Sequence, residues 1–149
     1  MIELRIERVD GGGSGLVEDW RRIHNTIIPT HVLSSDDVRE RAGRNRLEVA
    51  YVGDVAVGCT TVRPPTEEAP GTATVIARVL APYRRRGYGE ELYVHGLEQA
   101  RELGAETVET VVLASNEDGL RFALKHGFVE VERYLLDGDT IPWIDLRLT

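Results

Sequence analysis

Residues 79–92 read VLAPYRRRGYGEEL, and this stretch decides the fold. The apolar run TATVIARVL at 72–80 leads into it and predicts a strand, and helically spaced apolar residues follow it to about residue 103. Glycines between a strand and a helix let the chain turn tightly and let a ligand approach the main chain. Free N–H groups of a first helical turn, the helix dipole and arginine side chains together suit a pyrophosphate. The stretch therefore predicts an anion-binding turn.

The rest of the chain predicts strands and helices on both sides of this turn. Periodicity and cap residues predict further strands at 2–9, 47–53, 55–62, 106–113, 128–136 and 142–148, and helices at about 14–28, 34–43, 87–103 and 116–126. Three consecutive strands followed by strand–helix alternation imply antiparallel pairing first and parallel crossovers later. We therefore expect an α/β (α+β) fold, a mixed antiparallel/parallel central sheet of about seven strands flanked by four helices. No linker divides the chain, so we expect a single domain over residues 1–149.

Composition excludes several classes of protein. The net charge of −7 argues against a general nucleic-acid binder, which would normally be basic. No apolar run approaches the roughly eighteen residues that span a bilayer, and the start MIELRIERVD lacks the pattern of a signal peptide. The single cysteine, Cys59, cannot form an internal disulfide and is expected to be buried and inert. We expect a cytoplasmic protein with no nucleic-acid partner, no membrane partner and no metal.

The glycine-rich stretch GGGSG at 11–15 has two interpretations. It can be a flexible turn before the first helix or a phosphate-binding loop. The stretch lacks the lysine of a P-loop and the spacing of a dinucleotide fingerprint, which favours the turn.

Two motifs together resemble a known family. RRRGYG at 84–89 is similar to the Arg/Gln-x-x-Gly-x-Gly/Ala turn of GNAT-superfamily N-acetyltransferases, and NEDGLRFALKHGF at 116–128 is similar to the family's Asn, short helix and Gly-Phe segment. The order of strands and helices over 2–148 also resembles the GNAT fold. The resemblance implies an acyltransferase that moves an acetyl group from acetyl-CoA to a primary amine of a small molecule or peptide. Transfer would occur by direct attack in a ternary complex.

The resemblance also implies which residues bind coenzyme A. They are Val79, Arg84, Arg85, Arg86, Gly87, Tyr88, Gly89, Glu90 and Asn116. N–H groups from Arg85 to Glu90 would hold the pyrophosphate. The strand ending at Val79 would pair with the pantetheine arm, and its N–H would stabilise the oxyanion formed on attack. Asn116 would contact the pantetheine or the thiol; it can equally be a helix cap, and the two roles are compatible.

The catalytic residues stay unassigned because this sequence departs from the family pattern. GNAT enzymes often carry a proton-donating tyrosine about seven residues after the Asn, where this chain has Ala123 with Phe122 beside it. The glutamate base that many relatives carry on the strand before the turn is absent from TATVIARVL. The remaining candidates for acid or base are His24, His31, Tyr134, Glu67 and Glu68.

Because both usual acid–base residues are missing, a second function stays open, an acyl-CoA-binding sensor or a catalytically weak pseudo-acetyltransferase. The identity of the acceptor and of the acyl group is also open. The negative net charge mildly favours a cationic acceptor through long-range attraction. GNAT relatives are often dimers, so the resemblance allows a homodimer.

Overall fold

A computed structural model describes residues 3–10 and 14–148 of the chain. The predicted loop at 11–15 therefore lies largely outside the described residues. The strands are β1 (Leu4–Arg8), β2 (Arg46–Val52), β3 (Val55–Arg63), β4 (Thr72–Val79), β5 (Thr107–Leu113), β6 (Phe128–Tyr134) and β7 (Trp143–Leu148). The helices are α1 (Ser14–Ile27), α2 (Ser35–Arg44), α3 (Tyr88–Glu102) and α4 (Glu117–Lys125), with a 3-10 turn η1 at Ala81–Tyr83.

The seven strands form one sheet in the order β1-β2-β3-β4-β5-β7-β6. Strands β1 to β4 pair antiparallel, β4 and β5 pair parallel, and β5, β7 and β6 pair antiparallel again. The predicted mixed sheet of seven strands flanked by four helices is confirmed. Most element bounds differ from the sequence prediction by about one residue. The larger differences are that β6 ends at Tyr134, not at residue 136, and that the turn η1 was not predicted.

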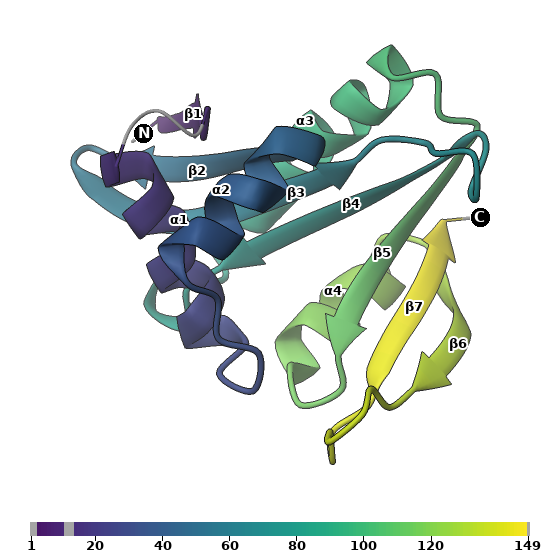
Figure 1. Cartoon of the computed structure of the whole chain (residues 1–149). Coiled ribbons are helices and arrows are strands. Elements are labelled where there is room, and N and C mark those ends of the chain that lie inside the picture. The colour runs from purple at the N-terminus through teal and green to yellow at the C-terminus, as the bar shows by residue number, and fades with distance from the viewer. Residues whose placement is uncertain (1–2, 11–13, 149) are drawn as a thin grey trace.

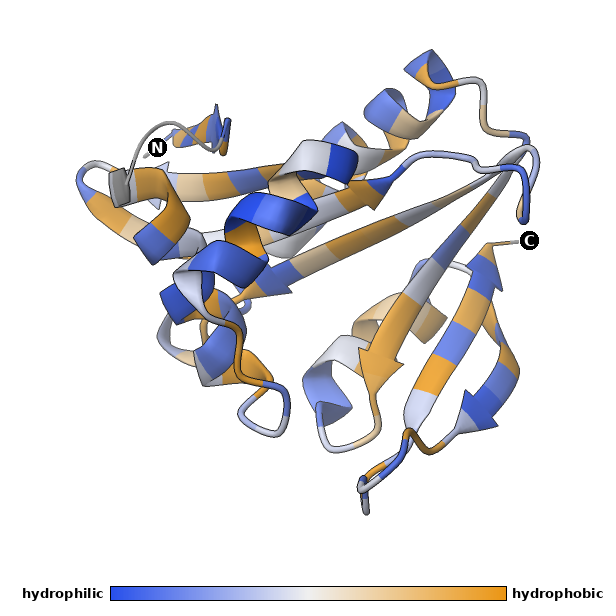
Figure 2. Cartoon of the chain, in the orientation of Figure 1, coloured by the Kyte–Doolittle hydropathy of each residue, from blue (hydrophilic) through white to orange (hydrophobic). Residues whose placement is uncertain are grey.

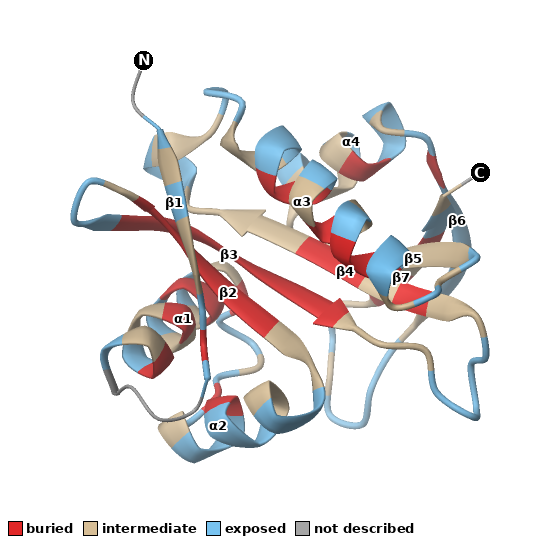
Figure 3. Cartoon of the chain, turned by 90° about the horizontal axis from the view of Figure 1, so that it is seen from above, coloured by how far each residue is buried: buried red, intermediate tan, exposed pale blue. Residues whose placement is uncertain are grey.

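The helices cover the two faces of the sheet in pairs. Helices α1 and α2 lie on one face and α3 and α4 on the other (Figure 3); we call these the α1/α2 face and the α3/α4 face. The α1/α2 pair stands over the β1–β4 half, and no helix of the described residues stands in front of β5, β7 and β6 on that face (Figure 1). Half of the α1/α2 face therefore lacks a helical cover.

Each face has its own apolar core. On the α1/α2 face, Val17, Trp20 and Ile23 of α1 pack with Leu47 and Cys59 of the sheet. Trp20 Nε1 also donates to the carbonyl of Thr60 at 3.1 Å, which fixes the helix to β3. On the α3/α4 face, the core contains Val62, Val75, Tyr93, Ala100, Val112, Ala123, Phe128, Ile144 and Leu146. In Figure 2 the middle of the sheet is mostly hydrophobic, while β7 alternates between hydrophobic and hydrophilic residues.

The sheet parts between β4 and β5. Their parallel pairing covers only Thr72–Thr107, Ala73–Val108 and Thr74–Glu109. Beyond these pairs the strands diverge, so that they meet at their amino ends and stand apart at their carboxyl ends (Figure 1). The remainder of β4 still pairs with β3 on its other side. One edge of β4 is therefore left open in the middle of the molecule.

Gly96 permits the close packing of α3 on the sheet, and we predict that alanine there destabilises the protein. A Cβ at Gly96 would lie 2.5 Å from Cγ1 of Val75, a buried β-branched side chain with little room to move. Overpacking of this kind costs about 1–3 kcal/mol, more than the roughly 1 kcal/mol that alanine gains over glycine in a helix.

Gly43 of α2 is the matched control, because a Cβ there meets nothing within 4 Å. Urea unfolding should give a lower free energy of unfolding for Gly96→Ala and a higher one for Gly43→Ala. Stabilisation by both substitutions would contradict the close contact.

Candidate functional site

A cavity of about 390 Å³ lies where β4 parts from β5, against the starts of α3 and α4. Its lining residues are Ile27, Ala77, Arg78, Val79, Tyr83, Arg84, Arg85, Gly87, Tyr88, Gly89, Glu90, Asn116, Asp118, Gly119, Arg121, Phe122, Lys125 and His126. Of the nine residues that the sequence proposed for coenzyme A, eight line this cavity. The exception is Arg86.

The turn before α3 presents main-chain amides to the cavity. Arg85 has φ 66° and Gly87 has φ 84°, so the chain turns twice through the left-handed region before α3 begins at Tyr88. No side chain of the residues that the structure describes caps this helix, and its first backbone bond is donated by Glu91 to the carbonyl of Gly87 at 3.1 Å. The N–H groups of Tyr88, Gly89 and Glu90 therefore lack helical partners and lie at the positive end of the helix dipole.

The three arginines of the turn have three different environments. Arg84 donates through Nε to the carbonyl of Val79 at 2.8 Å and through Nη1 to Asp118 at 2.9 Å. Arg86 is exposed and lies over the ring of Tyr83, 5.8 Å from its centroid. Arg85 is exposed at the cavity. Arg84 thus links the end of β4 to the start of α4, whereas Arg85 has its guanidinium available for an anion.

Val79 directs its backbone groups into the gap between β4 and β5. Leu80 N–H donates to the carbonyl of Val57 at 2.9 Å, so Leu80 is a hydrogen-bonded position of the β3–β4 ladder. In an antiparallel pair the adjacent residue points its N–H and C=O the other way. The carbonyl of Val79 accepts from Arg84, and β5 has already left the ladder at Thr74, so no strand lies opposite the Val79 N–H.

Asn116 is a helix cap that also lines the cavity. Its Oδ1 accepts from the N–H of Gly119 at 3.1 Å at the start of α4. The capping role predicted from the sequence is confirmed, and the same residue lies in the lining of the large cavity. The two roles coexist in this structure.

A smaller cavity of about 40 Å³ continues into the sheet between β4 and β5. Ala123 and Tyr93 both line it, and Ala123 is only 3% exposed. The hydroxyl of Tyr93 is buried without a hydrogen-bond partner in the described part of the chain, although buried hydroxyls normally have one. Sequence analysis placed Tyr93 only on an inward row of α3. Neither the missing bond nor its nearness to Ala123 could be read from one sequence.

The two histidine candidates lie on the α1/α2 face. His24 is buried at 3% exposure and stacks on Trp20; burial, followed by the charge of Arg78, lowers its pKa to about 4. His31 lies between α1 and α2, with Nε2 2.9 Å from Asp139 of the β6–β7 loop. His24 is therefore neutral near pH 7. His31 connects the segment between α1 and α2 to the β6–β7 loop, at the border of the half of the α1/α2 face that no described helix covers.

The other candidates for acid or base differ in their positions. Tyr134 donates to Asp145 at 3.0 Å, and burial followed by this bond raises its pKa to about 12. Glu67 and Glu68 are exposed in the loop before Thr72, at the amino end of β4. Val79 is at the other end of that strand, about 23 Å away at roughly 3.3 Å per residue. Neither glutamate lines the cavity, because closeness in sequence does not bring the two ends of a strand together.

The described residues also bear on three further expectations: the buried cysteine, a metal site and a membrane span. Cys59 is buried as expected, and burial raises the pKa of its thiol to about 12. Among residues 3–10 and 14–148, no group of three His, Cys, Asp or Glu side chains could hold a metal ion. No helix in that part of the chain has the length and apolar character needed to cross a membrane.

Comparison with known proteins identifies the class. The family model described as Acetyltransferase (GNAT) family matches residues 16–128, and the chain therefore belongs to the GNAT acetyltransferase family. A search of curated proteins by sequence found no match.

Solved structures share the fold over nearly the whole chain. A provisionally assigned phosphinothricin N-acetyltransferase superposes with TM-score 0.79 at 20% identity, covering 98% of both chains. YncA from Salmonella typhimurium, with its cofactor acetyl-CoA, gives TM-score 0.73 at 14% identity, covering 97% of this chain and 92% of that one. Arabidopsis thaliana NAA60 in complex with a bisubstrate analogue gives 0.78 at 16% identity, covering 97% of each. At these low sequence identities, the structural similarity establishes the fold alone.

His24 should make the stability of the protein depend on pH. Its pKa in the folded protein, about 4, is below the usual value of 6.5, so the unfolded chain binds more protons between these values. The free energy of unfolding should fall as the pH falls from about 6.5 to about 4, by up to about 3 kcal/mol from this residue.

Urea unfolding of the native protein and of His24→Gln across that range measures this contribution as the difference between the two pH profiles. Parallel profiles would mean that His24 is protonated equally in the folded and unfolded states.

Proposed function

We propose that the protein is an N-acetyltransferase that transfers the acetyl group of acetyl-CoA directly to a primary amine in a ternary complex. The observation that carries this proposal is the cavity at the parted strands, whose lining includes two sets of main-chain amides without a partner in the described residues. One set lies at the start of α3 and the other is the N–H of Val79. Belonging to the GNAT acetyltransferase family supports the same reaction.

The first set of amides suits the coenzyme A pyrophosphate. The N–H groups of Tyr88, Gly89 and Glu90 would bind its oxygens, with the guanidinium of Arg85 beside them. The pantetheine arm would follow the open edge of β4 in place of the missing strand. Arg84 would act indirectly, since its bonds to Val79 and Asp118 keep the turn, β4 and α4 together.

The second amide suits the reacting carbonyl. An amine nitrogen attacks the thioester carbon, the carbonyl oxygen becomes an oxyanion, and the N–H of Val79 would donate to it. The intermediate collapses to an amide as the carbon–sulfur bond breaks, and the coenzyme A thiolate leaves with its electron pair. The nitrogen loses a proton and the thiolate gains one, which requires a proton donor near the sulfur.

We propose Tyr93 as that donor. Its unpartnered hydroxyl lines the small cavity beside Ala123, where related enzymes place a tyrosine from the other helix. Burial raises the pKa of Tyr93, so the hydroxyl stays protonated at neutral pH. A tyrosine on α3 would thus replace the one missing from α4.

Gly89→Val should weaken coenzyme A binding about tenfold or more, because the new side chain would occupy the approach to the N–H groups of α3. Calorimetry with coenzyme A measures the affinity. A Cβ at Gly89 would lie 3.4 Å from the Phe122 ring, which the fold can accommodate. Gly43→Val on the remote helix α2 is the control and should bind normally. Normal binding by Gly89→Val would reject this position for the pyrophosphate.

Tyr93→Phe should lower kcat about tenfold to a hundredfold or more, as loss of a general acid does, while coenzyme A affinity is unchanged. Release of free thiol from acetyl-CoA with a panel of amines measures the turnover. An unchanged kcat would exclude Tyr93 as the donor.

The same assay decides between the enzyme and the acyl-CoA sensor that the altered position Ala123 leaves as the second candidate. Tight binding of acetyl-CoA without thiol release, for every amine in the panel, would favour the sensor.

A further inference from the structure

Three arginines on the α1/α2 face have no ion pair. Arg63 of β3, Arg78 of β4 and Arg41 of α2 are each partly buried. The structure shows no hydrogen bond or salt bridge for their guanidinium groups anywhere in residues 3–10 and 14–148. Other arginines of the chain do have such partners, for example Arg147 with Glu109 and Arg133 with Glu130.

The strand register places Arg63 and Arg78 on the same face. Arg63 stands opposite Thr74 and Arg78 opposite Cys59 in the β3–β4 ladder. Directly opposed residues share a face and residues two apart along a strand share it too, so both arginines lie on the face of Cys59. Cys59 packs with Trp20 of α1, which identifies this as the α1/α2 face. Arg78 also lines both cavities.

Burial and mutual repulsion act on these groups together. Burial lowers the pKa of Arg78, and the charges of Arg63 and Arg41 lower it further. Burial also lowers the pKa of Arg63, with a second contribution from Arg41. An arginine side chain nevertheless stays protonated in proteins, so the three positive charges remain.

The carboxylates that face these arginines offset only part of their charge. Asp145 of β7 acts on Arg63 and also accepts a bond from Tyr134, whereas no carboxylate of the described residues acts on Arg78. The histidines on this face add no negative charge: His24 is neutral, and His31 faces Asp139.

Two carboxylates of α2 act on Arg41 and offset part of its charge, and both also have other partners. Asp37 caps the helix with Ser34, and Glu40 pairs with Arg44. The thiol of Cys59 is uncharged, since burial raises its pKa to about 12. The positive charge of Arg78 therefore stays at the cavity without a carboxylate partner among the described residues, in a protein whose net charge is −7.

We infer that the amine acceptor carries an anionic oxygen group, a carboxylate or a phosphonate, which Arg78 and Arg63 bind on the α1/α2 face. This inference rests on the proposed acetyl transfer and names the substrate class for it. A guanidinium matches such groups with two parallel hydrogen bonds. Arg78 directly precedes Val79, so an anion held there brings the amine close to the thioester.

The local charge reverses the expectation from net charge that the acceptor is cationic. Exposed surface charges act at long range and are screened beyond about 8 Å at physiological salt. A partly buried guanidinium acts in direct contact and is screened much less. The cavity, rather than the surface, selects the acceptor.

The first test uses the native protein with three matched acceptor sets: L-amino acids, their carboxamides, and the corresponding 1-aminoalkylphosphonates. Thiol release from acetyl-CoA gives kcat/KM for each compound. One of the two anionic sets should exceed the carboxamides about tenfold or more, the change expected for one charge-assisted bond. The anionic set that reacts faster identifies the group. Equal or faster reaction of the carboxamides would overturn the inference.

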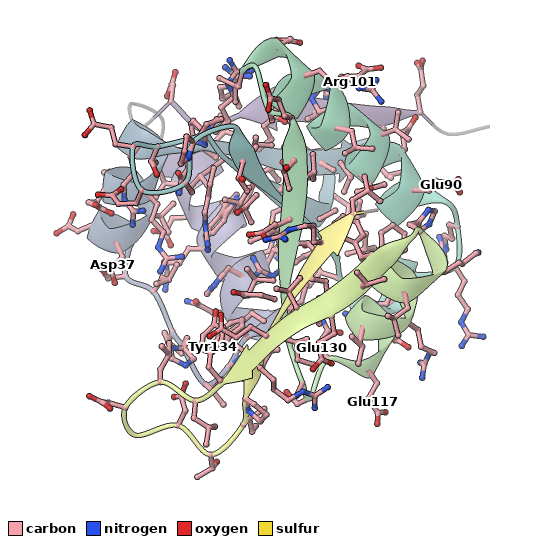
Figure 4. The ribbon with its side chains drawn as sticks, turned by 90° about the vertical axis from the view of Figure 1, so that its right-hand side faces the viewer. Asp37, Glu90, Arg101, Glu117, Glu130 and Tyr134 are labelled. Atoms are coloured by element: carbon pink, nitrogen blue, oxygen red, sulfur yellow. The ribbon has the colours of Figure 1, made fainter. Side chains whose placement is uncertain are left out.

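The second test uses Arg78→Gln and Arg63→Gln, with Arg101→Gln as the control. Arg101 is exposed in the last turn of α3, on the other face (Figure 4). The first two variants should lose about tenfold in kcat/KM for the preferred anionic acceptor and at most about twofold for its carboxamide. The control Arg101→Gln should keep its kcat/KM for both acceptors. Equal losses for both acceptors would show a structural role and overturn the inference.

Two further readouts separate this inference from the proposed function. Calorimetry with coenzyme A should give the same affinity for Arg78→Gln as for the native protein, and Arg78→Lys should restore part of the lost activity. If the native protein did not bind coenzyme A, the proposed acetyltransferase function itself would be overturned. Binding of coenzyme A with turnover of neutral amines only would overturn the anionic acceptor alone.

Discussion

The interrupted pairing between β4 and β5 is the constraint on which the site depends. A strand in the middle of a sheet normally has both edges bonded, and a buried N–H without a partner costs free energy comparable to a lost hydrogen bond. Here the ladder stops at Thr74, and Val79 directs its amide into the gap. The fold tolerates the open edge because β3 holds the other side of β4 and because α3 and α4 pack across the gap. The cavity is the space that this interruption leaves.

The three arginines of the turn at 84–86 divide into those that support the structure and one that is available for binding. Arg84 is fully engaged by Val79 and Asp118, so it stabilises the mouth of the cavity, and Arg86 lies against Tyr83. Arg85 alone has both an exposed guanidinium and a place in the lining. Three identical neighbours in the sequence therefore have different environments in the structure.

The sequence predicted the fold more completely than it predicted the site. Strands and helices followed from local periodicity and caps, and Asn116 is the cap that its position before Glu117 and Asp118 suggested. Features that depend on distant residues were not predictable. Glu67 is close to Val79 in sequence and far from it along β4, whereas Tyr93 and Ala123 come from separate helices and share a cavity. The isolated charges of Arg63 and Arg78 appear only once the register of two strands is known.

The cavity is reached by residues of both faces of the sheet, with Ile27 of α1 and Phe122 of α4 both in its lining. In the proposed reaction the donor is held chiefly by main-chain amides, which every substitution except proline retains, and the acceptor by side chains of the opposite face. Mutation on the α1/α2 face could then change which amine is modified while the use of acetyl-CoA persists. A descendant of this chain could acquire a new acceptor in a few substitutions, without rebuilding the half of the protein that supplies the acetyl group.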